Sequence, residues 1–305
     1  GANLNGGIPR LQAALEKDKT LSPQPLMELG KAYTKTQENE KASKAFEEAL
    51  GRRKNYGPAV DNLVAALFAQ SKLDEAVKVI EQARSAGYVD PVLLTNLGNA
   101  YLQQGKTDMA EAPLQGAAER DPDLPEPQNL LGLVNLAKGN AAEAESRFRE
   151  AIRIQPDFAV GHNNLANLLG QTRRYPEARY EFRKALALDP NYVEAHHLYA
   201  LLLEVMSDFE GARSELQTTL RLDPNQAEAH SELADLLLAK RDTQGAAAEY
   251  RAAIRLRPEL YEAHLGLANI LARQGAIAEA REHFEHAALS NDPAVRDQAL
   301  KALGH

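Results

Sequence analysis

Apolar and polar residues alternate along the chain in the pattern of paired amphipathic helices. Helix-length segments with apolar residues three and four positions apart come in twos, separated by short polar turns. The recurrence is clearest at proline, which returns every 34 residues at Pro122, Pro156, Pro190, Pro224 and Pro258. With that proline as position 32, the pattern predicts eight antiparallel helix pairs, over 23–56, 57–90, 91–124, 125–158, 159–192, 193–226, 227–260 and 261–294.

Small side chains occupy two positions of these units. Position 20 is alanine in all eight, and position 8 is glycine or alanine in all but the second, which has Val64. Small residues let two helix backbones approach closely, so both positions are predicted contact points within each pair. A larger side chain at position 24 shares the face of position 20: Phe46, Ile80, Leu114, Phe148, Phe182, Leu216, Tyr250 and Phe284.

Gly105, Gly139 and Gly275 stand where first helices are predicted to end. Pro113 falls inside the predicted second helix of 91–124, where it kinks the helix unless it lies in the first turn. The sequence leaves these two alternatives open.

Both ends of the repeat array are predicted to be capped, because a terminal unit otherwise exposes the apolar face that inner units bury. Residues 295–305 form the C-terminal capping segment, with helical punctuation over 293–303. Residues 1–22 form an N-terminal segment with a short capping helix, whose predicted apolar face is Ile8, Leu11, Ala14 and Leu15.

Residues 23–294 resemble the tetratricopeptide-repeat family, through a bulky position 4, Leu or Tyr at 7, a small residue at 8, Ala at 20 and 27, and Pro at 32. The resemblance implies an all-α fold, a right-handed superhelical solenoid of antiparallel helix pairs. It also implies that the first helix of each unit lines a concave groove through positions 2, 5, 6, 9, 12 and 13, and that another protein or a peptide binds there.

Asparagine is frequent at these groove positions. An amide both donates and accepts hydrogen bonds, so a row of amides can hold the backbone of an extended peptide. The segment from His162 to Asn167 resembles repeats of O-linked N-acetylglucosamine transferases, whose position-6 asparagines hold a substrate backbone; this implies a recognition arm and no transferase activity. Alternatively, the amides fill exposed polar sites or connect neighbouring units. The candidate amides are Asn62, Asn96, Asn99, Asn129, Asn163, Asn164, Asn167 and Asn269, of which Asn163, Asn164 and Asn167 are predicted to be exposed.

The groove positions become acidic toward the C-terminus, whereas Lys31 and Lys35 mark the other end. Such a surface suits a basic or polar partner segment, and we add Glu232 and Asp235 to the candidate site. The alternative is a solvated face that keeps the protein in solution. The acidic groove positions are Glu194, Glu204, Glu228, Glu232, Asp235 and Glu262.

Composition narrows the partners further. The 305 residues carry a formal net charge of −8, which argues against nucleic acid or an anionic membrane as the main partner. No apolar run approaches the roughly 18 to 20 residues that span a bilayer. The absence of cysteine excludes disulfides and thiolate chemistry but does not indicate a compartment. We expect a soluble protein, cytoplasmic or exported after leader removal.

Histidine recurs at position 4 of four consecutive units: His162, His196, His230 and His264. Equivalent atoms of stacked units are about 10 Å apart, too far to share a metal ion, so these rings are predicted to pack between units. His283 and His286 are assigned to an outer, solvated face. Because no motif for catalysis or phosphate binding occurs, we expect no cofactor, no metal and no enzymatic activity.

The sequence therefore predicts a protein–protein interaction scaffold that binds an extended peptide or a helix in its groove. Two alternatives stay open. One is a self-assembling structural subunit that forms an oligomer or filament, since solenoids extend when a cap is displaced. The other is the repeat arm of a larger enzyme or membrane-linked complex, because the chain opens with Gly1 and not methionine.

Overall fold

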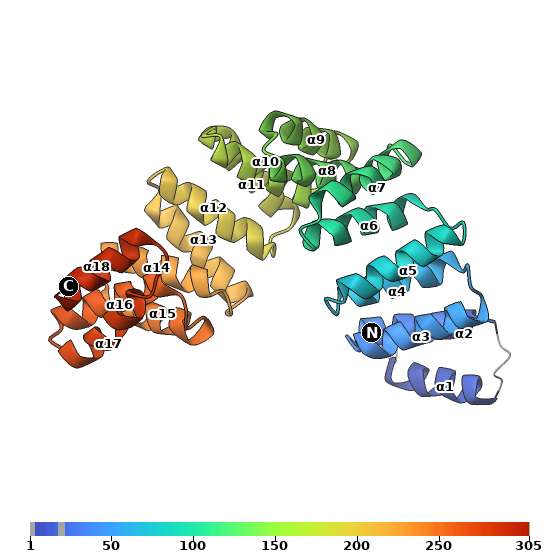
Figure 1. Cartoon of the computed structure of the whole chain (residues 1–305), viewed down its shortest axis with the longest axis horizontal. Helices are drawn as coiled ribbons and strands as arrows, with labels where there is room; N and C mark the ends of the chain where they lie inside the picture. The colour runs from blue at the N-terminus through green and yellow to red at the C-terminus, as the bar shows by residue number, and fades with distance from the viewer. Residues whose placement is uncertain (1–3, 18–21, 305) are drawn as a thin grey trace. The chain divides into compact units, whose positions relative to one another are not determined.

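The structure is a computed structural model that describes residues 4–17 and 22–304. The described residues are helical and contain no strand (Figure 1). The helices are α1 (Leu4–Lys17), α2 (Gln24–Lys35), α3 (Asn39–Arg52), α4 (Gly57–Phe68), α5 (Leu73–Ser85), α6 (Pro91–Gln103), α7 (Thr107–Arg120), α8 (Pro125–Ala137), α9 (Ala141–Ile154), α10 (Ala159–Gln171), α11 (Tyr175–Leu188), α12 (Val193–Val205), α13 (Phe209–Leu222), α14 (Ala227–Ala239), α15 (Thr243–Leu256), α16 (Tyr261–Arg273), α17 (Ile277–Ala287) and α18 (Pro293–Leu303). The predicted all-α architecture of helix pairs is confirmed.

Each repeat is a hairpin whose two helices pack closely on one another. The alanine at position 20 is buried in every repeat, as is the larger side chain at position 24. In the first repeat, a Cβ atom placed on Gly30 would lie 2.3 Å from the Phe46 ring. The same crowding holds between Gly132 and Phe148, at 2.4 Å. Small residues at position 8 therefore give the position-24 side chain room to enter the hairpin.

The turn between the two helices of a repeat uses a left-handed residue at position 15. This residue is Gly105, Gly139 or Gly275 in three repeats. In the other five it is not glycine, and its φ still lies between 58° and 65°. The predicted helix ends at the three glycines are confirmed.

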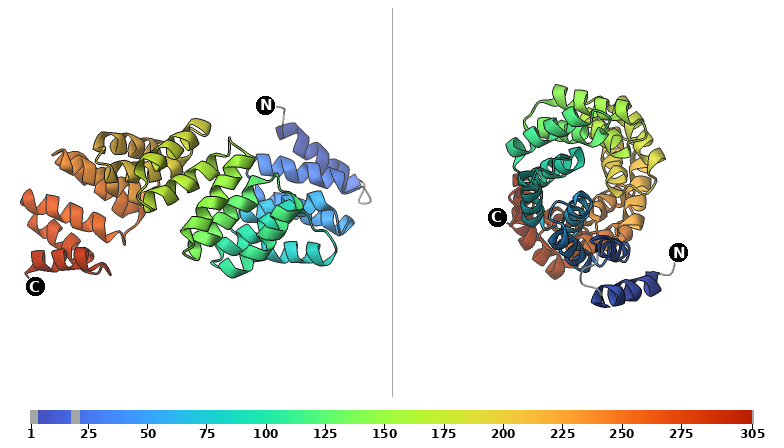
Figure 2. Two further views of the ribbon diagram at one scale, coloured as in Figure 1. Left: turned by 90° about the horizontal axis from the view of Figure 1, so that it is seen from above. Right: turned by 90° about the vertical axis from the view of Figure 1, so that its right-hand side faces the viewer.

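The helices form two compact bodies, 1–156 and 157–305, each with its own helix pairs and core. The repeat frame runs through this division unchanged, so sequence spacing does not indicate it. In Figure 2, consecutive pairs stack side by side within each body. We call residues 1–156 the N-terminal body and residues 157–305 the C-terminal body.

In most neighbouring repeats of each body, the first helices contact one another. This holds for α2 with α4, α4 with α6 and α6 with α8 in the N-terminal body, and for α10 with α12 and α14 with α16 in the C-terminal body. Second helices of neighbouring repeats make at most marginal contact with one another. The first helices therefore lie on the inner side of each stack.

Terminal helices cover the outermost repeats. At the C-terminus, α18 packs on α16 and α17 and buries Val295 and Ala299, and it ends at Gly304 with φ 88°. At the N-terminus, Ile8, Leu11 and Leu15 of α1 pack against the core of the first repeats. Ala14 is exposed, contrary to its predicted place on the apolar face, because only Ile8, Leu11 and Leu15 of that face reach the core. Part of the predicted segment 1–22 lies outside the described residues.

Pro113 lies in the middle of α7, beyond its first turn. The proline nitrogen has no hydrogen to donate to the carbonyl of the preceding turn, so α7 lacks one backbone hydrogen bond. Of the two alternatives that the sequence leaves open, the structure has the interior position.

Candidate functional site

The predicted amides at position 5 do not line a surface. Asn163 is completely buried and Asn129 is only 4% exposed. The Nδ2 of Asn163 lies 3.4 Å from the Tyr192 hydroxyl, and its buried Oδ1 has no hydrogen-bond partner in the described part of the chain. The predicted exposure of Asn163 is therefore wrong, because its side chain lies in the packed interior next to Tyr192 and not in solvent.

The remaining candidate amides keep part of their surface exposed. Asn62, Asn96, Asn99, Asn164 and Asn167 are half-buried, and Asn269 is exposed. Asn62 donates to the Pro58 carbonyl at 2.7 Å, one turn earlier in its own helix. Asn99 and Asn167 accept from glutamines four residues later, at 3.3 and 3.4 Å. These weak local bonds leave the amides able to exchange partners.

The candidate amides are divided between the two bodies. Asn62, Asn96, Asn99 and Asn129 belong to the N-terminal body, and Asn163, Asn164, Asn167 and Asn269 belong to the C-terminal body. Within the C-terminal body, Asn164 and Asn167 lie on α10 and Asn269 lies on α16.

Acidic side chains of α12 and α14 form a cluster in the C-terminal body. The Nε2 of His197 lies 2.7 Å from Glu232 Oε2 and connects the two helices, and this hydrogen bond raises the pKa of His197. Burial raises the pKa of Glu204, and the charges of Glu232 and Asp235 raise it further. One buried oxygen of Glu204 has no hydrogen-bond partner among the residues described.

Asp235 also borders a pocket of 310 Å³ between α14 and α16. Tyr250 is almost completely buried, and its hydroxyl donates a hydrogen bond to Asp235 Oδ1. Leu238, Leu265 and Ile270 supply apolar walls. Two of the sequence-predicted site residues, Asp235 and Asn269, thus line one pocket, which we call the Asp235 pocket.

The position-4 histidines tie the two helices of their repeats together. In three consecutive repeats, the Nδ1 atom lies within 2.6 Å of a glutamate oxygen at position 23: His162 with Glu181, His196 with Glu215, and His230 with Glu249. In the last repeat, position 23 is His283, and the two Nδ1 atoms are 2.9 Å apart. His283 is half-buried in this contact, so its predicted place on a solvated face is wrong.

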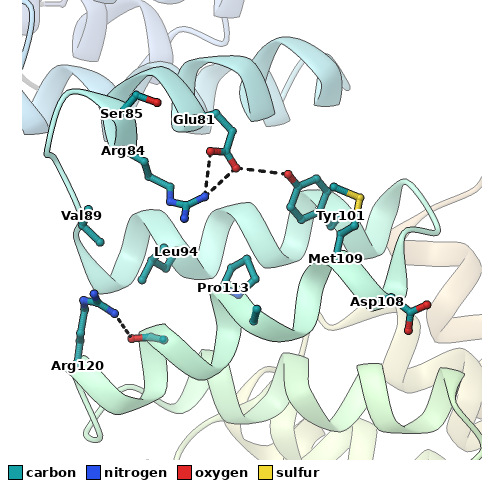
Figure 3. Close-up of a pocket in the computed structure, with 12 residues that line it drawn as sticks. Glu81, Arg84, Ser85, Val89, Leu94, Tyr101, Asp108, Met109, Pro113 and Arg120 are labelled. Atoms are coloured by element: carbon teal, nitrogen blue, oxygen red, sulfur yellow. Dashed lines mark hydrogen bonds and ion pairs between the residues drawn. The ribbon is translucent and has the colours of Figure 1, made fainter.

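Two larger clefts lie on the second-helix side of the N-terminal body. One, of 670 Å³, lies between α5, α6 and α7 (Figure 3). Its polar wall is Glu81, which accepts two hydrogen bonds from Arg84 and lies 3.4 Å from the Tyr101 hydroxyl, and its opposite wall includes Met109 and Pro113. The other cleft, of 590 Å³, lies between α3, α4 and α5. Neither cleft was predicted from the sequence, in which the only local signal is Pro113 one turn after Met109 in a predicted helix.

No helix within the described residues is long and apolar enough to cross a membrane. Over those same residues, no group of three or more His, Asp or Glu side chains has the arrangement of a metal site.

Stacked antiparallel helix pairs with a repeated small-to-large contact define the class of all-α helical-repeat proteins. The sequence matches the tetratricopeptide repeat family over residues 23–56, 62–125, 125–158, 159–192, 197–260 and 232–295. The chain belongs to this family. Its members generally mediate protein–protein interactions, and in this general sense the chain is an interaction scaffold.

Solved structures share the fold at low sequence identity. The structure titled "Functional Characterization of Pseudomonas Aeruginosa pilF" matches with a TM-score of 0.65 and 23% identity, over 69% of this chain and 96% of that one. The structure titled "Crystal structure of APC/C hetero-tetramer Cut9-Hcn1" matches with a TM-score of 0.70 and 15% identity, over 87% of this chain and 52% of that one. No curated protein sequence matches the chain.

Proposed function

We propose that the chain binds an extended segment or a helix of a partner protein on the first helices of its C-terminal body, and that it acts by binding and not by catalysis. We call this face of α10, α12, α14 and α16 the first-helix surface. It combines the half-buried amides of α10 with the acidic cluster of α12 and α14. The first helices lie on the inner side of the stack, where a partner segment can contact several repeats at once.

The observation that carries the proposal is the mixture of charge and exposed apolar surface on α12. Leu201 and Val205 are 36% and 61% exposed, one turn apart, and they follow His197 on the same face of the helix. Glu204 lies beside them, and one of its buried oxygens has no hydrogen-bond partner among the described residues. Exposed apolar side chains among acidic ones favour a partner segment that brings both apolar and basic groups.

A peptide display screen on the immobilised full chain tests the proposal, followed by fluorescence anisotropy with a selected peptide. We expect a Leu201→Ser, Val205→Ser double variant to weaken binding about tenfold or more, since each lost apolar contact contributes on the order of 1 kcal/mol. The matched control is Tyr180→Ser, which removes an exposed aromatic side chain from the second helix α11 and leaves binding unchanged.

Three results contradict the proposal: no peptide is selected, the control weakens binding as much as the double variant, or light scattering shows assembly into large species without a partner. The last result supports the self-assembling subunit.

A further inference from the structure

We infer that the Asp235 pocket holds a cationic side chain, lysine or arginine, of the partner segment. This rests on the proposed function and assigns one of its contacts. The pocket lies entirely within the C-terminal body, between two first helices, and its volume of 310 Å³ is enough for one long side chain.

Three departures from the repeat pattern meet at this pocket. Position 24 is tyrosine only at Tyr250, position 6 is glycine only at Gly266, and position 9 is acidic only at Asp235. The other repeats have phenylalanine, leucine or isoleucine at position 24, with no polar atom to satisfy. The three unusual residues contact one another, so they form one arrangement and not three separate variations.

Gly266 is what makes room for this arrangement. A Cβ atom on Gly266 would lie 2.3 Å from the Tyr250 ring and 2.6 Å from its hydroxyl oxygen. Any side chain at position 266 would therefore push the end of the tyrosine away from Asp235. With glycine there, the hydroxyl reaches the first-helix layer and holds one oxygen of Asp235 in a fixed orientation.

The lining of the pocket fits an aliphatic stem that ends in a positive charge. Leu238, Leu265 and Ile270 provide apolar walls for the stem. Asp235 provides the carboxylate, whose second oxygen is not used by Tyr250. Glu262 adds a second negative charge and Asn269 an amide acceptor.

The charges around the pocket decide whether it attracts a cation or an anion. Arg273 is the one cation in the lining, which also includes the carboxylates of Asp235 and Glu262. Beyond the rim, Glu232 and Glu204 are close enough to Asp235 for their charges to interact. The negative charges outnumber the positive one, so a cation is attracted and an anion is repelled.

The test uses the full chain and two small probes, N-acetyl-L-arginine methylamide and its neutral isostere N-acetyl-L-citrulline methylamide. We expect the arginine probe to shift the NMR signals of the Gly266 backbone amide and the Asn269 side-chain amide in a saturable way, and the citrulline probe to leave them in place. Absence of a saturable shift, or equal shifts with both probes, overturns the inference.

Variants locate the charge that the probe contacts. Asp235→Asn keeps an oxygen for the Tyr250 hydroxyl but removes the charge, and we expect it to weaken arginine binding about tenfold. Gly266→Ala narrows the pocket, and we expect it to weaken arginine binding as well. The control Glu282→Gln removes an exposed carboxylate of the second helix α17, outside the lining, and leaves binding within about twofold. An unchanged affinity in Asp235→Asn contradicts the inference.

These outcomes separate the inference from the proposed function. If the selected peptide needs Leu201 and Val205 but binds equally well to Asp235→Asn, the first-helix surface is correct and the pocket assignment is wrong. If the arginine probe binds but no peptide does, the pocket stands as a cation site and the proposed function fails.

Discussion

The Nδ1 atom of His264 lies 2.9 Å from the Nδ1 atom of His283, at the place where three preceding repeats pair a histidine with a glutamate. In the His196–Glu215 pair, protonation of the ring strengthens a hydrogen bond to a carboxylate. In the His–His pair, protonation of both rings brings two positive charges together. The same position of the repeat thus responds to acid in opposite directions.

The pKa shifts set the direction of a pH prediction. Burial lowers the pKa of both His264 and His283, and the other nearby histidines, including His286, lower it further. The opposing groups are the Pro258 carbonyl for His264, and Glu279 and Glu282 for His283, while Arg251 lowers the pKa of His283. Because the neutral rings favour the fold, their stabilisation is present above the usual pKa of about 6.5 and is lost as pH falls through the lowered pKa values.

The pKa of His196 is shifted in the opposite direction. Its hydrogen bond to Glu215 raises its pKa, so its stabilisation is present below about pH 6.5 and is lost as pH rises through the raised value. We expect α16 and α17 to lose hydrogen-exchange protection between pH 7 and pH 5, relative to α12 and α13, once intrinsic exchange rates are corrected for. Equal changes in both hairpins would falsify this prediction.

Exchanging the residue at position 23 should exchange the pH response. His283→Glu gives the last repeat the pairing of its neighbours, and we expect it to stabilise the α16–α17 hairpin at pH 6 by about 1 kcal/mol, a charge-assisted hydrogen bond discounted for its partial exposure. Glu215→His is the matched reverse variant and should make α12 and α13 acid-sensitive. If both variants keep the pH dependence of the wild-type protein, the residue pairs at positions 4 and 23 do not determine the response of the hairpins to pH.

Asn163 and Asn167 differ in burial and provide a stability test. Asn163→Ala removes a buried amide and leaves a small cavity, with an expected loss of about 1 to 2 kcal/mol. Asn167→Ala removes a half-buried amide with a weak bond inside its own helix, and its effect should stay within about 0.5 kcal/mol. Urea unfolding measures the free energy of both variants. Equal losses would contradict the prediction, because they would mean that the two side chains are equally buried.

Because the residue at position 15 is in the left-handed conformation, we expect two substitutions there to change the unfolding free energy in opposite directions. Arg241 has φ 65°, a conformation that costs a non-glycine residue about 1 kcal/mol, so Arg241→Gly should raise the unfolding free energy by about 0.5 to 1 kcal/mol. Gly139 has φ 78°, and Gly139→Ala should lower it by a similar amount, about 0.5 to 1 kcal/mol. Thermal unfolding measures both variants, and shifts of the same sign would contradict the explanation.

Pro113 interrupts the hydrogen bonding of α7. Pro113→Ala restores a donor in the middle of the helix and should stabilise the N-terminal body by about 1 to 3 kcal/mol. Glu111→Ala in the same helix is a control for the added helix propensity of alanine. Its measured effect must be corrected for the lost hydrogen bond between Glu111 and Lys138. A destabilised Pro113→Ala variant would mean that the proline ring packs in the cleft of Figure 3.

Much of the fold follows from local spacing. Eight alanines at position 20 and large apolar residues at position 24 are enough to predict the hairpins, because a helix of fixed pitch places them on one face. The candidate site was predicted less well. Asn163 and Asn164 are adjacent in a helix, yet one is buried and the other is half-buried, since successive helical residues point about 100° apart around the helix axis.

The sequence by itself determined the repeat length, the helix pairs, the family and the helix ends at Gly105, Gly139 and Gly275, all of which follow from local spacing that recurs every 34 residues. Only the tertiary structure decided the contacts between residues 15 or more positions apart. These include Tyr250 with Asp235, Gly266 beside Tyr250, and His264 with His283. The reason is physical: periodicity specifies the face of a helix on which a side chain lies, but burial and partners depend on which side chain the neighbouring helix brings opposite to it.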